Sequence, residues 1–257
     1  MTVVRIDAVG SFHHRAALAL LAAHAIPGVE HTNIEGGTHT RLCRLAGTNV
    51  RVTLSMDRAG VTADIEANAR LSREAAVMIR SWLDLDTDSR TIDEALRDDP
   101  VLRPMIKRRP GIRLIGYPDE FEAIAATVLG QQVSLAAART FAGRLAEALG
   151  ERAQGLIAFP APGAIASVQT AELQQVIGLS RARAATLHAV ATAWAAGISL
   201  RDRSLAEARS TLLAIAGVGP WTADYVSIRA LQDPTWAPYR SYATLHLWTE
   251  SAYLKSR

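Results

Sequence analysis

LLAIAGVGPWTADY, residues 212–225, is the most informative stretch of this 257-residue sequence. Gly217 and Gly219 flank one apolar residue between two helical patterns, and Pro220 opens the second helix, where a missing N–H costs nothing. Glycine lets the backbone turn sharply and approach another molecule closely. The amides of such a turn suit a phosphate oxygen, although an isolated Gly-x-Gly between helices is usually only a tight turn.

The first third of the chain mixes two periodicities. A helical apolar run over 16–24 stops at Pro27-Gly28, and strand-like segments follow at 38–45, 49–55 and 61–66. A second helical run covers 72–85 and ends at the polar stretch 86–90, where a domain boundary is expected. These patterns predict a small antiparallel sheet with helices packed on it.

From Phe121 onward the pattern is helical and rich in alanine, with segments at 121–130, 135–149, 171–178, 181–195 and 204–214. The predicted class is α+β, with a small antiparallel-sheet domain followed by a mostly helical core. The predicted domains are residues 1–94, residues 119–231, and a truncated second helical domain built from 95–118 plus 232–257.

Composition narrows the class of protein. The net charge is +3, the pI is about 9.3, and all basic residues except Lys107 and Lys255 are arginine. This fits a nucleic-acid partner, and it equally fits a bias in genomic base composition. The single Cys43 excludes an intrachain disulfide, a four-cysteine zinc site and a cysteine-ligated iron–sulfur cluster. The apolar stretches are too short to span a membrane, so a soluble cytoplasmic protein is expected.

The 212–225 stretch resembles the helix-hairpin-helix of base-excision DNA glycosylases. Its continuation Pro220-Trp221-Thr222-Ala223 looks like the branch of DNA-3-methyladenine glycosylase II, the AlkA type. Three further segments resemble that branch in the same order: PGIRL at 110–114, LGQQVS at 129–134 and YRSYATLHLW at 239–248. They match its interdomain segment, its strand-penetrating loop and its final helix.

The resemblance implies specific DNA contacts. Gly217 and Gly219 would present their amides to a phosphate, with Thr222 nearby. Gln131 and Gln132 lie in the strand-penetrating loop, and Gln132 would fill the space that a flipped nucleotide vacates. An ordinary helix-capping role is the alternative for Gln132. No cofactor is required, but the carbonyls of Leu213, Ile215 and Val218 match positions that hold a monovalent cation in the family.

The resemblance also implies a base pocket of Trp221, Tyr225 and Trp248. An alkylated purine such as 3-methyladenine is cationic, so aromatic faces attract it by stacking and cation–π interaction. Trp221 and Tyr225 are four residues apart and share a helix face, a spacing that by itself more often marks core residues. Leu20 stands where a phenylalanine can sit in the family, which makes the pocket less aromatic here.

Lyase chemistry is not expected. Glycosylases that cut the backbone form a Schiff base through a lysine two residues after the second hairpin glycine, and that position is Trp221 here. A monofunctional hydrolase is the consistent interpretation.

The segment that carries the family's catalytic aspartate is missing. Asp233-Pro234-Thr235 runs directly into Trp236, so about 25 residues, a loop and a helix of ordinary length, have no counterpart. Pro238 is not the family's proline, because the final helix already begins at Tyr239; that alignment would put Arg240 in the aspartate's place. Asp224 and Asp233 are the carboxylates nearest in sequence to the missing segment. Asp224 is predicted to be an exposed helix residue, and Asp233 to end a helix before Pro234. The catalytic residue is therefore unknown.

Two hypotheses of different class follow. The first is a monomeric base-excision-repair glycosylase that hydrolyses the N-glycosidic bond of alkylated purines, such as 3-methyladenine, in double-stranded DNA. The second is a non-catalytic damage-binding protein, or an inactive deletion product, on the same scaffold. A generic helix-hairpin-helix module would explain Gly217 and Gly219 but not the other matching segments.

Overall fold

The computed structural model describes residues 1–201, 203–230 and 239–253, with only the backbone of 227–230 and 252–253. The chain forms two compact units. Unit 1 comprises residues 1–25, 31–118 and 232–257, and unit 2 comprises residues 26–30 and 119–231.

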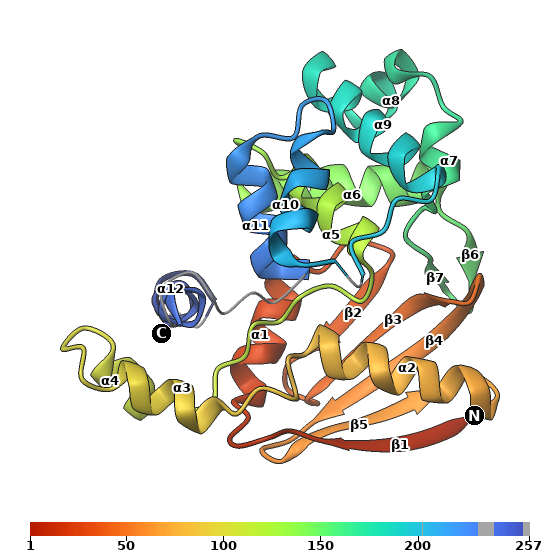
Figure 1. Ribbon diagram of the computed structural model, residues 1–257. Coiled ribbons are helices and arrows are strands. Elements are labelled where there is room, and N and C mark those ends of the chain that lie inside the picture. Colours follow the sequence, from red (N-terminus) through yellow and green to blue (C-terminus); the bar gives the residue numbers. More distant parts are fainter. Residues whose placement is uncertain (202, 231–238, 254–257) are drawn as a thin grey trace. The chain divides into compact units, whose positions relative to one another are not determined.

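Unit 1 is built on a five-stranded sheet of order β1-β5-β4-β3-β2 (Figure 1). Its strands are β1 (Thr2–Asp7), β2 (Glu30–Asn33), β3 (Thr38–Leu45), β4 (Thr48–Met56) and β5 (Gly60–Ile65). β5 pairs antiparallel with both β1 and β4, with Val52 opposite Ile65. Val61, Ala63 and Ile65 are fully buried while the residues between them are partly exposed. This alternation marks a sheet with one face in the core.

The described part of unit 1 also contains helices, of which the first two pack on this sheet. They are α1 (His14–His24), α2 (Ala69–Trp82), α3 (Ser89–Leu96), α4 (Arg103–Arg108) and α12 (Arg240–Trp248), and α12 continues into the π-helical turn Thr249–Tyr253. The Asn68 side chain caps α2 by accepting from the Leu71 amide. Leu18 of α1 and Ile79 of α2 pack in one cluster with Val61 of the sheet. α12 contributes Tyr242 and Leu245 to the same cluster.

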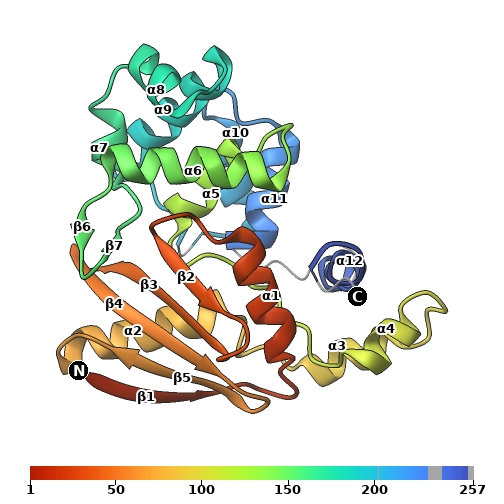
Figure 2. The ribbon, with the colours of Figure 1, turned by 180° about the vertical axis from the view of Figure 1, so that it is seen from behind.

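Unit 2 is helical, and Figure 2 shows the long helix α6 in front of α5. Its helices are α5 (Glu120–Leu129), α6 (Leu135–Leu149), α7 (Pro162–Ala166), α8 (Thr170–Ile177), α9 (Arg181–Ala195), α10 (Leu205–Leu213) and α11 (Pro220–Ala230). A short hairpin pairs β6 (Arg152–Ala153) with β7 (Leu156–Ile157). Residues 26–30 interrupt unit 1 in the sequence but belong to unit 2, and Ile26 and Val29 lie in its core.

The predicted α+β class is confirmed, and the helices expected from residue 121 onward lie within a residue or two of their predicted bounds. The strand β1 was not expected, because as an edge strand it buries only Ile6 fully and leaves Val3 64% exposed. α2 ends at Trp82 rather than Leu85, since Asp84 takes a left-handed backbone with φ of 54°. Residues 86–118 belong to the same compact unit as the sheet. The subdivision of that unit into two domains stays a prediction.

Candidate nucleic-acid interface

The turn between α10 and α11 has a glycine that folding requires. Gly217 has a φ of 84°, a left-handed conformation that residues with side chains rarely adopt. A Cβ at this position would also overlap the side chain of Thr186 on α9. The first glycine of the motif is therefore explained by packing alone, whatever it binds.

The second glycine has no such internal reason. Gly219 lacks a positive φ, and a Cβ built on it would meet no atom within 4 Å. In the described part of the chain, neither the Gly217 nor the Gly219 amide donates a hydrogen bond. Free amides at the N-terminus of an 11-residue helix favour the binding of an anion, and the anion contact of this hairpin stays a prediction. A phosphate oxygen is the ligand that this geometry suits.

The three carbonyls expected to hold a monovalent cation are differently engaged. The carbonyl of Ile215 accepts the Val218 amide at 3.0 Å, which leaves it a second lone pair. The carbonyls of Leu213 and Val218 accept no turn hydrogen bond among the described residues. The donor set fits a cation bound by carbonyl oxygens, and the cation itself stays a proposal.

Gln131 connects the 129–134 loop to the hairpin. Its side-chain amide donates to Thr222 Oγ1 at 2.9 Å, and its carbonyl accepts from the guanidinium of Arg183 on α9. Thr222 is 3% exposed, so its hydroxyl lies beneath the surface of the turn. Both residues thus hold the loop against α11. Direct DNA contacts by Gln131 and Thr222 remain predictions.

Gln132, in contrast, is exposed and has a left-handed backbone with φ of 54°. That conformation is uncommon for a residue with a side chain and costs about 1 kcal/mol or more. It is not an N-cap: Ser134 accepts the Ala137 amide and caps α6. The helix-capping alternative for Gln132 is therefore removed, and its role as a plug stays a proposal.

Trp221 and Tyr225 lie one turn apart on α11 and stack on each other. Their ring centroids are 5.3 Å apart and their planes differ by 18°. Rings in direct contact leave no room for a base between them. Trp221 is 60% exposed, so its outer face is the surface available for stacking.

Asp224 is not the exposed position that the sequence suggested. Its side chain is 24% exposed and accepts a hydrogen bond of 2.8 Å from Arg209 on α10. The pair ties the two helices of the hairpin together. Because its charge is already paired, Asp224 is a weak candidate for stabilising a positive charge on a sugar.

The remaining predicted site residues lie in unit 1 or outside the described residues. Trp248 is on α12 and is 40% exposed, whereas Leu20 is buried in the core of unit 1. Arg240 begins α12, in agreement with the interpretation of 239–248 as the final helix. Asp233 and the junction at Trp236 lie outside the described residues.

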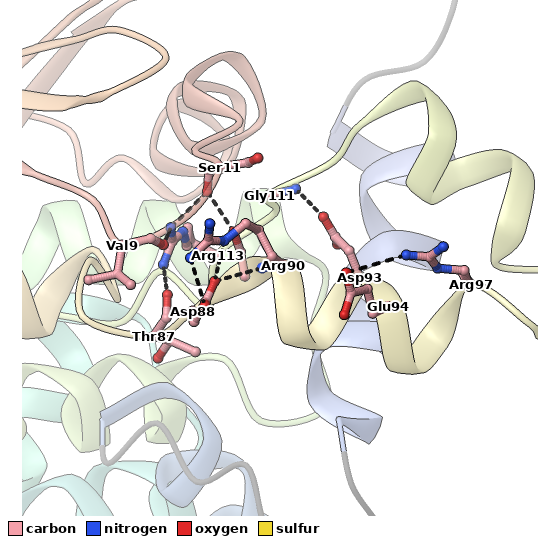
Figure 3. Close-up of polar contacts among 11 residues, drawn as sticks. Val9, Ser11, Thr87, Asp88, Arg90, Asp93, Glu94, Arg97, Gly111 and Arg113 are labelled. Carbon is pink, nitrogen blue, oxygen red and sulfur yellow. Dashed lines mark hydrogen bonds and ion pairs between the residues drawn. The ribbon is translucent and has the colours of Figure 1, made fainter.

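A buried arginine in the PGIRL segment was not singled out for a structural role. Arg113 is 3% exposed and donates to the carbonyls of Val9, Ser11, Asp84 and Thr87, three of which are seen in Figure 3. Carbonyl oxygens on several sides compensate a charge that burial would otherwise penalise. Arg113 thereby joins the connection between β1 and α1 to the connection between α2 and α3.

Family models match both parts of the chain. One is described as the AlkA N-terminal domain and matches residues 3–119. The other is described as the HhH-GPD superfamily base excision DNA repair protein and matches residues 125–239, which include the hairpin. The chain belongs to the HhH-GPD superfamily of base excision DNA repair proteins.

Two relatives of this superfamily member are named as a DNA repair enzyme and as a DNA glycosylase. The "Probable bifunctional transcriptional activator/DNA repair enzyme AlkA" of Mycobacterium tuberculosis is 33% identical over 96% of this chain, which spans 56% of that protein. The "DNA-3-methyladenine glycosylase 2" of Escherichia coli is 29% identical over 90% of this chain and 91% of its own length. The two alignments extend over 292 and 266 residues, more than the chain contains. Parts of both relatives therefore have no counterpart in this HhH-GPD chain.

A solved structure shares the fold. The 3-methyladenine DNA-glycosylase from Archaeoglobus fulgidus superposes with a TM-score of 0.74 at 21% identity, over 91% of this chain and 80% of its own. In the described residues, no group of three or more His, Cys, Asp or Glu side chains could hold a metal ion. No described helix is long and apolar enough to cross a membrane.

Proposed function

We propose that this HhH-GPD protein is a monomeric DNA glycosylase that releases alkylated purines, such as 3-methyladenine, from double-stranded DNA. One observation carries the proposal. The free amides of Gly217 and Gly219 lie directly before α11, and the exposed aromatic face of Trp221 lies at the second residue of that helix. A phosphate anchor next to a stacking surface is what an enzyme that extrudes a base requires. Its relatives are named for this activity.

The substrate class follows from the charge of the ligand. A purine alkylated at N3 or N7 carries a positive charge, which the faces of Trp221 and Tyr225 attract. Cleavage of the C1′–N bond sends the bonding electrons to the purine, which leaves as a neutral base. Water then adds to the sugar cation at C1′ and loses a proton to solvent. The reaction needs no lysine and no cofactor.

The sugar cation is the species of this reaction for which the chain offers the least stabilisation. A fixed carboxylate beside it typically contributes about 10²- to 10³-fold in rate. Among the described residues near the hairpin, Asp224 is already paired with Arg209. The direct joining of Asp233 to Trp236 in the sequence supports the second candidate function, a damage-binding protein with little or no turnover.

Single-turnover release of methylated bases from alkylated duplex DNA tests the proposal. The parent chain, Asp224→Asn and Asp233→Asn should be compared with a relative that contains the additional residues. Slow but measurable release by the parent supports a glycosylase, and loss in one variant identifies its carboxylate. No release together with tight binding of alkylated or abasic-analogue DNA would replace the glycosylase by the damage binder. Neither release nor binding would exclude both.

A further inference from the structure

A large open cavity in unit 1 has a strongly basic lining. Its volume is about 960 Å³. Its lining comes from residues 10–15 before and within α1, residues 58–59 between β4 and β5, Arg108 at the end of α4, and Pro110 after that helix. Five of the lining residues have basic side chains: His13, His14, Arg15, Arg58 and Arg108. None has a carboxylate.

Two carboxylates beside this lining, those of Asp57 and Glu250, are already engaged, as is that of Asp88 next to Gly10, which accepts from Arg90. The Asp57 carboxylate accepts hydrogen bonds from Nη1 and Nη2 of Arg5, at 2.7 and 2.9 Å, and from the amides of Ala59 and Gly60. Glu250 is shared between Arg108, at 3.0 Å, and Arg109. Glu250 therefore faces two guanidinium groups, and Asp57 is paired with an arginine that does not line the cavity.

Two cations of the lining remain without a partner. Arg15 and Arg58 are exposed and, within the described chain, form no hydrogen bond or ion pair. Like charges gathered around one cavity repel each other unless an anion occupies it. Arginine offers a planar fork of donors that matches the oxygens of a phosphate.

The two histidines add donors to the same lining. Nδ1 of His13 accepts the Ala16 amide at 3.1 Å, so the neutral ring carries its proton on Nε2. Burial lowers the pKa of His14, and the charges of Arg15 and Arg58 lower it further, against the opposing charge of Asp57. Burial likewise lowers the pKa of His13. An anion in the cavity would reverse part of this repulsion and draw protons to both rings.

We infer that this cavity is a binding site for phosphate groups, formed by Arg15, Arg58 and Arg108 with His13 and His14. The site is made by unit 1 alone and does not depend on the hairpin or on base excision. The phosphate belongs either to a DNA backbone or to a small phosphorylated molecule, and the two sources share the same chemistry.

Titration of the full chain with inorganic triphosphate tests the site, read by NMR at the imidazoles of His13 and His14. The parent should bind saturably at low salt, and the apparent pKa of both histidines should rise. Arg15→Gln/Arg58→Gln should weaken binding by about tenfold or more, because the variant removes two guanidinium groups that would donate to phosphate oxygens. Arg70→Gln/Arg73→Gln, which removes the same charge from the exposed surface of α2, is the matched control and should bind like the parent.

Duplex DNA identifies the source. If the phosphate is that of DNA, the slope of log affinity against log salt should fall by about 0.9 for each DNA phosphate that Arg15→Gln/Arg58→Gln no longer neutralises, and should not change in the control. An unchanged slope, together with weakened triphosphate binding, assigns the site to a small phosphorylated ligand. The inference is overturned if the parent shows no saturable triphosphate binding, or if both double variants bind as the parent does.

Discussion

The hydroxyl of Tyr242 on α12 donates a hydrogen bond of 2.7 Å to the carboxylate of Asp84, which lies 158 residues earlier in the chain. The Leu114 amide donates to the same oxygen at 3.1 Å, and Thr87 donates to the other. Burial raises the pKa of the Asp84 carboxyl, against these hydrogen bonds, which lower it. The pair attaches the helix that carries Trp248 to the end of α2.

Removing this hydroxyl should destabilise unit 1. We expect Tyr242→Phe to lower the free energy of unfolding by about 1 to 2 kcal/mol, because a buried carboxylate loses one of its donors. Urea denaturation followed by circular dichroism measures the change. Tyr225→Phe is the matched control, since the Tyr225 hydroxyl forms no hydrogen bond in the described chain. Equal stability of parent and Tyr242→Phe would show that the bond contributes nothing.

Acid should destabilise unit 1 through a buried histidine on the same helix. His246 is 1% exposed, and burial, with the charges of Arg109 and His13, lowers its pKa to about 4. Its Nε2 lies 4.0 Å from Asp93, and its Nδ1 has no hydrogen-bond partner among the described residues. The unfolded chain binds the proton more readily, with a pKa of about 6.5. The stability that neutral His246 contributes is therefore present above pH 6.5 and is lost as the pH falls toward 4.

The expected loss over this range is about 3 kcal/mol, from a pKa difference of roughly 2.5 units. His246→Leu should make the free energy of unfolding less dependent on pH between 6.5 and 4. His31→Leu, an exposed histidine of β2, should leave the parent's pH dependence intact. A profile for His246→Leu that parallels the parent's would contradict the assignment.

The two hairpin glycines should respond differently to substitution. Gly219→Leu should fold normally, because its surroundings are open, and should weaken binding to duplex DNA of any sequence by blocking the approach of a phosphate. Gly217→Leu should instead lower stability, because of its positive φ and the overlap with Thr186. Gly163→Leu, at another open position, is the control for Gly219. Thermal unfolding and fluorescence anisotropy separate the two effects, and unchanged DNA affinity of Gly219→Leu would make the hairpin a structural turn only.

Trp221 should discriminate damaged from undamaged DNA. Trp221→Ala should weaken binding of a duplex with an extruded cationic base by about 1 to 3 kcal/mol, since the exposed face of the ring is removed. Binding of undamaged duplex should change much less. Val176→Ala removes an exposed apolar side chain elsewhere in unit 2 and should affect neither ligand. An equal loss for both duplexes would place Trp221 outside base recognition.

Much of the fold could be predicted because its signals are local. The helices from residue 121 onward follow from periodicity and caps, such as Ser134 and Ser204, that lie within a few residues of the segments they start. β1 and α4 gave weak signals, since the first is an edge strand and the second is six residues long. For the site, the sequence singled out Gly217, Gly219 and Trp221. It also predicted that Asp224 is exposed, which is wrong, because Asp224 is partly buried in an ion pair with Arg209.

The sequence by itself determined the family and the presence of a hairpin with an aromatic residue directly after it, because these depend on residues adjacent in the chain. Only the tertiary structure decided which polar groups meet over long separations. Arg113 finds four carbonyls, Asp84 finds Tyr242, and Arg15 and Arg58 come to line one cavity. Contacts between residues so far apart in the sequence depend on the path of the whole chain. Local propensity does not encode that path, and burial then sets the charge state of the groups brought together.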